Sequence, residues 1–206
     1  MTNLPLPTSA QRADIERLYL AAFPPEERDP LDDLWALADS GRGKFSVLDL
    51  HGRAVAFAFQ IIRPDIYEIV SYLVVDATLR GLGIGSVLCR AIMKDFSIRQ
   101  PDGILLIEGH DRQAKLYGEL GFKKLALDYQ VPSSIDPDGD PLHFNLLAYR
   151  PKQPDGDDAL SANSAVTVMR ALMSDGYHLT NDHPLMTRII RQLDDGTALL
   201  QWPRPQ

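Results

Sequence analysis

The sequence predicts a mixed α/β fold (α+β), with a mixed central sheet of about six strands flanked by helices and a C-terminal extension. Three observations predict it. Apolar residues recur at helical spacing near the N-terminus, change to strand-like runs from Lys44 to Asp76, and return to helical spacing after Gly85. Strands and helices then alternate up to Arg150, which implies a parallel crossover flanked by antiparallel pairs.

Two helices are expected before the first strand. Thr8 and Gln11 have the spacing of a capping box, and the helix that they start ends at Pro24-Pro25. Asp29 is a candidate N-cap of the second helix, because Pro30 would take its first position.

The rest of the first 150 residues is expected to contain six strands and two helices. The strands cover 44–50, 54–63, 67–76, 104–107, 123–131 and 143–150, and the first two form a hairpin around His51-Gly52. One helix starts near Ser86, and the other lies within 113–120 with Gly121 just past its end.

The composition divides the chain into three parts. Residues 1–150 form the predicted domain, 151–158 a linker rich in Pro, Gly and Asp, and 159–206 an extension with two helices and a short strand. The extension is expected to pack on the core or on a second subunit, because exposure of its apolar set would be costly. That set comprises Val166, Val168, Met169, Leu172 and Met173.

Composition also excludes several classes of function. A net charge of −7 opposes binding to phosphate backbones, so no nucleic-acid partner is expected. No stretch has the pattern of a membrane span or a secretory signal, which predicts a cytoplasmic protein that does not act at a membrane. The single cysteine, Cys89, excludes paired-cysteine zinc sites and is expected to be a small core residue; no metal site is predicted.

The segment Arg80-Gly81-Leu82-Gly83-Ile84-Gly85 joins a predicted strand to a predicted helix. Glycines allow close approach of a ligand, and the helix N-terminus attracts phosphate. A P-loop would need a lysine that is absent between Arg80 and Lys94, and a dinucleotide fingerprint would need glycine in place of Ser86.

This segment resembles the acetyl-CoA signature of the GCN5-related N-acetyltransferase (GNAT) family, and the likeness covers roughly residues 1–150. Arg80, Gly83 and Gly85 match the first signature; Tyr117, Gly121 and Phe122 match the second; and residues 23–28, FPPEER, resemble an FPxEER segment of a bacterial subgroup. The resemblance implies a GNAT-like fold and transfer of an acetyl group from acetyl-CoA to a primary amine by direct attack. It implies that the cofactor-binding residues are Leu73, Val74, Val75, Arg80, Gly81, Leu82, Gly83, Ile84, Gly85 and Ser86.

The resemblance also implies the catalytic groups. Tyr117 is the candidate acid for the CoA sulfur, and a carboxylate would remove the proton of the amine. Glu68 and Glu108 both remain open as this base. His110 stands where relatives often carry asparagine, so a cofactor contact is not expected there and a surface histidine is favoured.

The acceptor is expected to be a small-molecule or peptide amine, which the acidic run from Glu26 to Asp33 would attract. A homodimer is the favoured assembly. Two alternatives remain open: a catalytically silent acetyl-CoA-binding or interaction module, and a nucleotide-binding protein that uses the same glycine loop.

Overall fold

The computed structural model describes residues 7–152, 160–194 and 200–201 of the 206-residue chain. In these residues seven strands form the main sheet in the order β1-β2-β3-β4-β8-β5-β9, and β6 pairs with β7 apart from it. Only β3 and β4 are parallel among the described pairs. The strands are β1 Gly43–Leu50, β2 Arg53–Arg63, β3 Tyr67–Val75, β4 Leu105–Gly109, β5 Lys123–Leu125, β6 Gln130–Val131, β7 Leu142–His143, β8 Asn145–Tyr149 and β9 Leu200–Gln201.

This arrangement confirms the predicted mixed α/β class. Six strands of the main sheet come from residues 43–149, and the extension adds β9 at the edge beside β5. The helices are α1 Ser9–Ala22, α2 Leu31–Asp39, α3 Ile84–Arg99, α4 Asp111–Glu119, α5 Ala162–Tyr177 and α6 Pro184–Asp194, with 3-10 turns η1 Pro25–Glu27 and η2 Ala77–Leu79.

The helix starts follow the sequence signals with one correction. Thr8 and Gln11 form the predicted capping box at the start of α1. The N-cap of α2 is Pro30 rather than Asp29, and no side chain caps this helix. The Asp29 carboxylate instead accepts a hydrogen bond from Tyr72, which turns it away from the helix.

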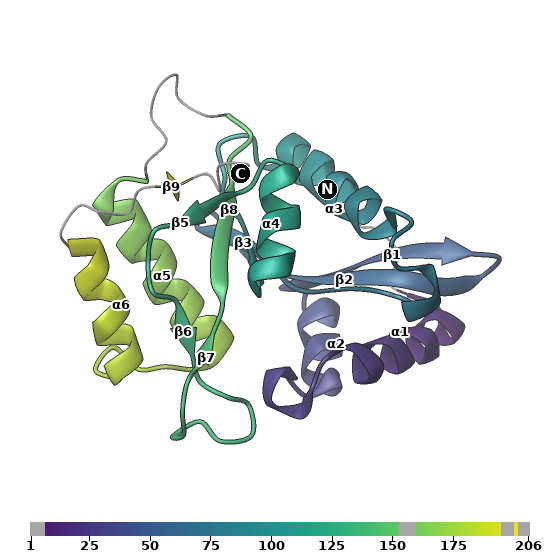
Figure 1. The fold of residues 1–206 in the computed structure, drawn as a ribbon, viewed down its shortest axis with the longest axis horizontal. Coiled ribbons are helices and arrows are strands. Elements are labelled where there is room, and N and C mark those ends of the chain that lie inside the picture. Colours follow the sequence, from purple (N-terminus) through teal and green to yellow (C-terminus); the bar gives the residue numbers. More distant parts are fainter. Residues whose placement is uncertain (1–6, 153–159, 195–199, 202–206) are drawn as a thin grey trace.

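Helices cover both faces of the sheet (Figure 1). Helices α3 and α4 pack on one face through a cluster that includes Phe96, Leu105 and Ile107. The other face is shared: α1 and α2 pack on β1 to β3, and α5 and α6 pack on the far half of the sheet, around Leu106. The apolar side chains of the extension therefore lie on the same core as the rest of the chain.

A β-bulge at Ser71 changes which side chains of β3 face which helices. Phe59 pairs with Tyr72 and Gln60 pairs with Val70, which leaves Ser71 without an opposite residue. Since side chains alternate along a strand, one extra residue reverses the alternation. Glu68 and Val70 therefore lie on the α3 face, whereas Tyr72 lies on the opposite face.

Strands β3 and β4 diverge beyond this bulge. They pair only from Glu68 to Val70 and from Leu105 to Ile107, although β3 continues to Val75. Among the described strands, residues 72–75 pair with β2 alone. The divergence opens the middle of the sheet at the carboxyl ends of two parallel strands.

The predicted strand 123–131 is wrong as a single element. The chain leaves the main sheet after Leu125 and forms β6 only at Gln130. Between them Tyr129 turns inward, where its ring is buried and its hydroxyl donates to Glu108. That contact explains the break in the strand.

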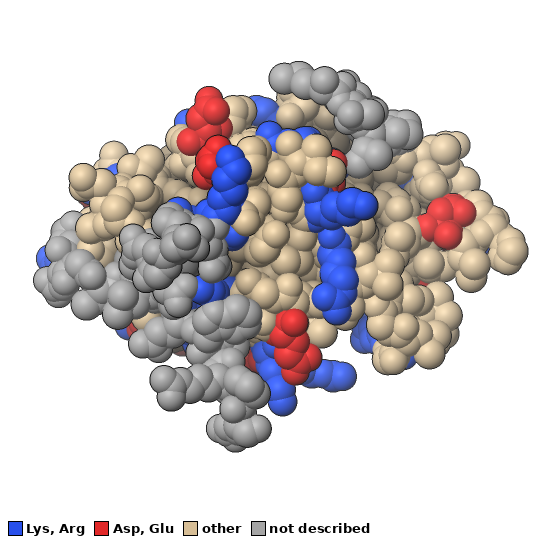
Figure 2. Space-filling view, turned by 90° about the horizontal axis from the view of Figure 1, so that it is seen from above, with Lys and Arg blue, Asp and Glu red and all other residues tan. Residues whose placement is uncertain are grey.

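The extension contains the two predicted helices and the predicted short strand. Most of the predicted linker, residues 153–158, lies outside the described residues. No helix among the described residues is long and apolar enough to cross a membrane. On the face in Figure 2, Lys and Arg side chains lie on both sides of an uncharged central strip, so the net charge of −7 is not spread evenly.

Candidate active site

A cavity of about 130 Å³ lies where β3 and β4 diverge. It reaches both faces of the sheet, because Tyr117 of α4 and Tyr177 of α5 both line it. The backbone of Ser71 to Leu73 and of Gly109 forms its wall between the strands. Carboxylates at its lining come from Glu26, Glu27, Asp29 and Glu108.

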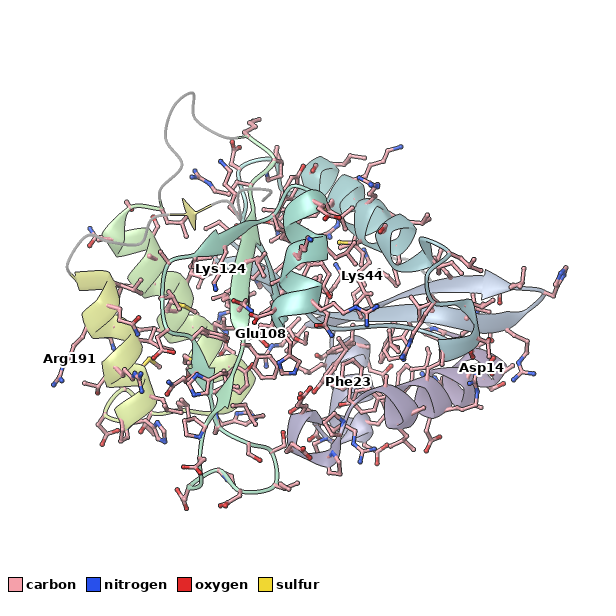
Figure 3. All side chains as sticks on the ribbon, in the orientation of Figure 1. Asp14, Phe23, Lys44, Glu108, Lys124 and Arg191 are labelled. Atoms are coloured by element: carbon pink, nitrogen blue, oxygen red, sulfur yellow. The ribbon has the colours of Figure 1, made fainter. Side chains whose placement is uncertain are left out.

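Glu108 lies on β4 at the centre of the molecule, between the extension helices and α1 and α2 (Figure 3). Its Oε1 accepts a hydrogen bond from the hydroxyl of Tyr129, and its Oε2 accepts one of 2.7 Å from the hydroxyl of Tyr177. Burial raises the pKa of Glu108, while the two hydroxyl donors lower it and the charge of Asp29 raises it further. A carboxylate whose pKa is raised is a stronger general base than an ordinary one.

Tyr117 projects from α4 into the same cavity. Its side chain is buried, and its hydroxyl makes no hydrogen bond with any of the residues that the structure describes. Burial raises the pKa of Tyr117, and the neighbouring Cys89 adds to the effect, so the phenol keeps its proton. A protonated phenol with a free O–H can donate to a leaving group.

Cys89 has the predicted core position. It is 1% exposed in the cluster beneath α3, and burial raises the pKa of its thiol to about 12. The thiol is therefore not a nucleophile in this site.

Glu68 lies outside the cavity. It is fully buried on the α3 face, where both of its oxygens accept hydrogen bonds of 3.0 and 2.9 Å from Arg99 Nη2. The side-chain amide of Gln60 donates to the same carboxylate. The structure thus brings Glu108 and Tyr117 together at one cavity and separates Glu68 from both.

Asp29 forms the acidic rim of the cavity with Glu26 and Glu27. Tyr72 donates to Asp29 Oδ2 over 2.8 Å, and burial raises the pKa of Asp29. His110, predicted to be a surface histidine, is 53% exposed, with Nε2 at 3.1 Å from Glu27 Oε1.

The glycine loop stands beside the diverging strands. Gly81 and Gly83 have φ of +83° and +78°, conformations that favour glycine. Gly83 is the N-cap of α3, and no side chain of the described residues caps the helix, which leaves its first amides available to an anion. A Cβ at Gly81 or Gly83 would meet no protein atom within 4 Å, so there is room for a phosphate.

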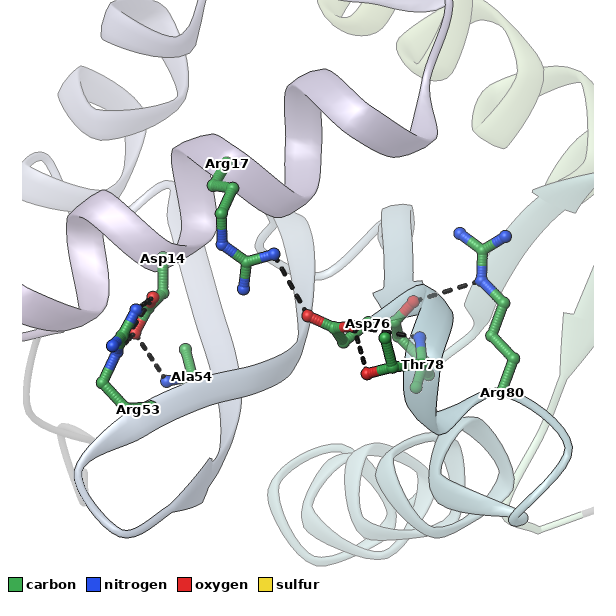
Figure 4. A network of polar contacts seen from close by, with 8 residues as sticks. Asp14, Arg17, Arg53, Ala54, Asp76, Thr78 and Arg80 are labelled. Atoms are coloured by element: carbon green, nitrogen blue, oxygen red, sulfur yellow. Dashed lines mark hydrogen bonds and ion pairs between the residues drawn. The ribbon is translucent and has the colours of Figure 1, made fainter.

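Two contacts fix the chain before this loop (Figure 4). Arg80 Nε donates to the carbonyl of Val75 over 3.3 Å, and Arg17 of α1 forms an ion pair of 3.1 Å with Asp76. The Asp76 side chain also accepts from Thr78, which lowers the pKa of Asp76 more than Arg17 does. The loop and the helix start are thereby anchored to β3.

A wider groove of about 990 Å³ adjoins the cavity. Asp29, Ser134 and Tyr177 line both spaces, which makes the two spaces neighbours. Residues of α1, α2 and the end of α5 form the walls of the groove. The groove thus lies next to the cavity on the protein surface.

Six described tyrosine or carboxylate side chains of this site are absent from the sequence-based catalytic set: Glu26, Glu27, Asp29, Tyr72, Tyr129 and Tyr177. A sequence signal existed only for the three carboxylates, which belong to the acidic run. Tyr129 and Tyr177 lie in segments that local pattern interprets as strand and helix, and only the tertiary fold brings them to Glu108.

Residues 41–124 match the family model described as "Acetyltransferase (GNAT) domain". No curated protein sequence matches the chain. The match contains both strands that diverge, the glycine loop, Glu108 and Tyr117.

Solved structures share the fold. A Bacteroides thetaiotaomicron protein described as an acetyltransferase of the GNAT family has a TM-score of 0.64 and 20% identity, over 86% of this chain and 98% of its own. The ribosomal-protein-S18-alanine N-acetyltransferase of Escherichia coli has a TM-score of 0.55 and 18% identity, over 73% and 94%. An aminoglycoside 6'-N-acetyltransferase complexed with coenzyme A has a TM-score of 0.57 and 16% identity, over 72% and 95%. At these sequence identities the comparisons show a shared fold only.

Proposed function

We propose that this chain, whose GNAT domain match and fold support an acetyl-CoA-dependent N-acetyltransferase, acetylates a cationic primary amine by direct attack on the thioester. One observation carries the proposal. A partly buried carboxylate, Glu108, and a protonated phenol, Tyr117, line the same cavity beside the glycine loop.

The reaction needs three steps from these residues. Glu108 removes a proton from the ammonium of the acceptor, and the neutral nitrogen forms a bond to the thioester carbonyl carbon. A backbone N–H of the β3 segment Leu73 to Val75, which has no strand partner on the β4 side, stabilises the carbonyl oxygen as it gains charge. The carbonyl then re-forms as the carbon–sulfur bond breaks, and Tyr117 donates its proton to the leaving thiolate. The second proton that the nitrogen loses on becoming an amide returns to the Tyr117 phenolate.

Acetyl-CoA would be held by the segment from Arg80 to Ser86. The free amides at the start of α3 and the open space above Gly81 and Gly83 support a pyrophosphate there. Arg80 forms no ion pair within the described ranges, and its guanidinium, which donates through Nε to Val75, would add positive charge beside the phosphates.

Charge supports a cationic acceptor. Asp29 and Glu108 are partly buried, and neither has an ion pair with a cation among the residues that the structure describes. Carboxylates that are partly removed from water favour a cationic partner, so an ammonium group would supply that charge. The adjoining groove would take the rest of the acceptor, either a small molecule or a peptide.

The choice between the two carboxylates follows from their surroundings. Glu68 already has Arg99 and Gln60 as partners, and it lies on the face away from the acidic rim. We therefore assign Glu108 as the base and Glu68 as a buried structural partner of Arg99.

The test is release of the CoA thiol with a panel of amines, measured for the parent, Glu108→Gln and Glu68→Gln. Glu108→Gln should lower turnover roughly 100-fold or more, because it removes a general base. Glu68→Gln serves as the matched control and should keep turnover within about twofold while it lowers stability. Equal losses in the two variants would reject the assignment.

The same assay separates the alternatives. Stabilisation by CoA without thiol release from any amine would favour the silent binding module. Stabilisation by ATP or NAD and not by acetyl-CoA would favour the nucleotide-binding protein. The three-part division of the chain, the FPxEER subgroup, the cytoplasmic location and the homodimer stay predictions.

A further inference from the structure

We infer that Tyr177, the last residue of α5, is a positioning residue for Glu108, so that the C-terminal extension supplies part of the active site. This inference rests on the proposed function, in which Glu108 is the base.

The geometry places one phenol on each oxygen of the carboxylate. Tyr129 reaches Oε1 from the segment after β5, and Tyr177 reaches Oε2 from α5 over 2.7 Å. Two donors on different oxygens fix both the position and the plane of the carboxylate. Tyr177 also lines the cavity and the adjoining groove, so it stands between Glu108 and the path of the acceptor.

Helix α5 holds Tyr177 firmly. Met169, Leu172 and Met173 of this helix are buried against the sheet face that carries Leu106. The end of the helix is also closed, because the N–H of Leu179 donates over 3.1 Å to the carbonyl of Met173. His178, with φ of +56°, supplies the left-handed residue that this closure needs. A frayed helix end could not hold a hydroxyl against a partly buried carboxylate.

The hydrogen bond from Tyr177 lowers the pKa of Glu108. Among the described residues, four ionisable groups interact with this carboxylate. They are the donors Tyr129 and Tyr177, the acidic Asp29, and Tyr67, which interacts with it electrostatically. No cation forms an ion pair with Glu108 in the described part of the chain. The hydroxyl of Tyr177 therefore stabilises the ionised base in a place where burial opposes ionisation.

The test compares Tyr177→Phe with the matched control Tyr149→Phe. The phenylalanine variant keeps the ring and removes only the hydroxyl. The hydroxyl of Tyr149 also has a side-chain partner, Ser97 Oγ at 3.1 Å, but Tyr149 does not line the cavity. Two readouts are needed: the pH dependence of kcat/KM, and the titration of the Glu108 carboxyl by ¹³C NMR, assigned with Glu108→Gln.

Tyr177→Phe should move both the acidic limb of the pH profile and the carboxyl titration to higher pH by roughly one unit, which lowers kcat/KM roughly tenfold at pH values on the acidic limb. Tyr149→Phe should move neither. Activity that falls equally at all pH values, with an unmoved titration, would overturn the inference. If Tyr177→Phe does not fold, fluorotyrosine at position 177 replaces it; this more acidic phenol should move the titration to lower pH, and no movement would overturn the inference.

The NMR titration does not depend on activity. A titration that moves while the pH profile stays fixed supports the contact and rejects Glu108 as base. A titration that stays fixed rejects the contact, whatever the activity.

Discussion

The ring of Tyr117 lies against Gly109 so closely that a Cβ added to the glycine would come within 3.1 Å of Tyr117 Cε2. The same Cβ would come within 2.9 Å of Gln113 Cβ. Gly109 ends β4 one residue after Glu108, so the absence of a side chain there allows the acid and the base to approach one cavity.

Gly109→Ala should therefore move Tyr117 away from its position. We expect a loss of stability of about 1–3 kcal/mol from overpacking and a fall in turnover. Urea unfolding and thiol release would measure both. Gly176→Ala is the control for stability, because within 4 Å its Cβ would meet only Leu172 Cδ1, at 3.7 Å, among the described residues. If the two alanine variants behaved alike, the close contact would have no consequence.

Tyr117→Phe should separate chemistry from binding. The hydroxyl has no protein partner among the described residues, so the variant should keep its stability and its affinity for CoA. Turnover should fall up to about 100-fold, since a general acid acts mainly in the transition state. Steady-state kinetics with CoA titration would check this, and turnover within about twofold of the parent would reject Tyr117 as acid.

Gly83→Val should abolish stabilisation of the protein by CoA. The side chain would stand in the open space at the start of α3 and would also strain a residue with φ of +78°. Gly52→Val is the control for backbone strain alone. Gly52 has φ of +79° and equally open surroundings, but it lies in the turn between β1 and β2. A thermal shift with CoA that survives in Gly83→Val would contradict the phosphate site.

Glu108 should make stability depend on pH in a defined direction. The pKa of Glu108 in the folded protein is raised above its ordinary value of 4.5, so the folded state keeps this proton after the unfolded chain has released it. The contribution to stability is complete below pH 4.5 and is lost as pH rises through the raised pKa. Between these values the unfolding free energy of the parent should fall relative to Glu108→Gln by about 1.4 kcal/mol per pH unit. Urea unfolding at several pH values would test it, and parallel pH dependences would contradict it.

Local signals predicted most of the fold. The capping box at Thr8, the hairpin at His51-Gly52 and the glycine loop each depend on neighbouring residues, and each has the predicted structure. The predicted strand 123–131 failed because a distant contact, between Tyr129 and Glu108, takes the chain out of the sheet.

Only the part of the site that consecutive residues form could be predicted from the sequence. The glycine loop follows from six consecutive residues, but the choice between Glu68 and Glu108 depends on which face of the sheet each carboxylate occupies. Glu68 pairs with Arg99 of the following helix, which places its carboxylate on the α3 face. No residue spacing in the sequence predicts this pair. Tyr177 is 69 residues from Glu108 in the sequence, so only the packing of α5 could reveal the pair.

The burial of Cys89 makes the protein suited to chromogenic thiol assays. The chain has one cysteine, and its thiol is 1% exposed with a pKa near 12. A disulfide reagent in solution should therefore react with released CoA and leave the folded enzyme unlabelled. The same reagent, used without substrate, would label only molecules whose core has opened, so that one chemical probe counts product in the first experiment and unfolded chains in the second.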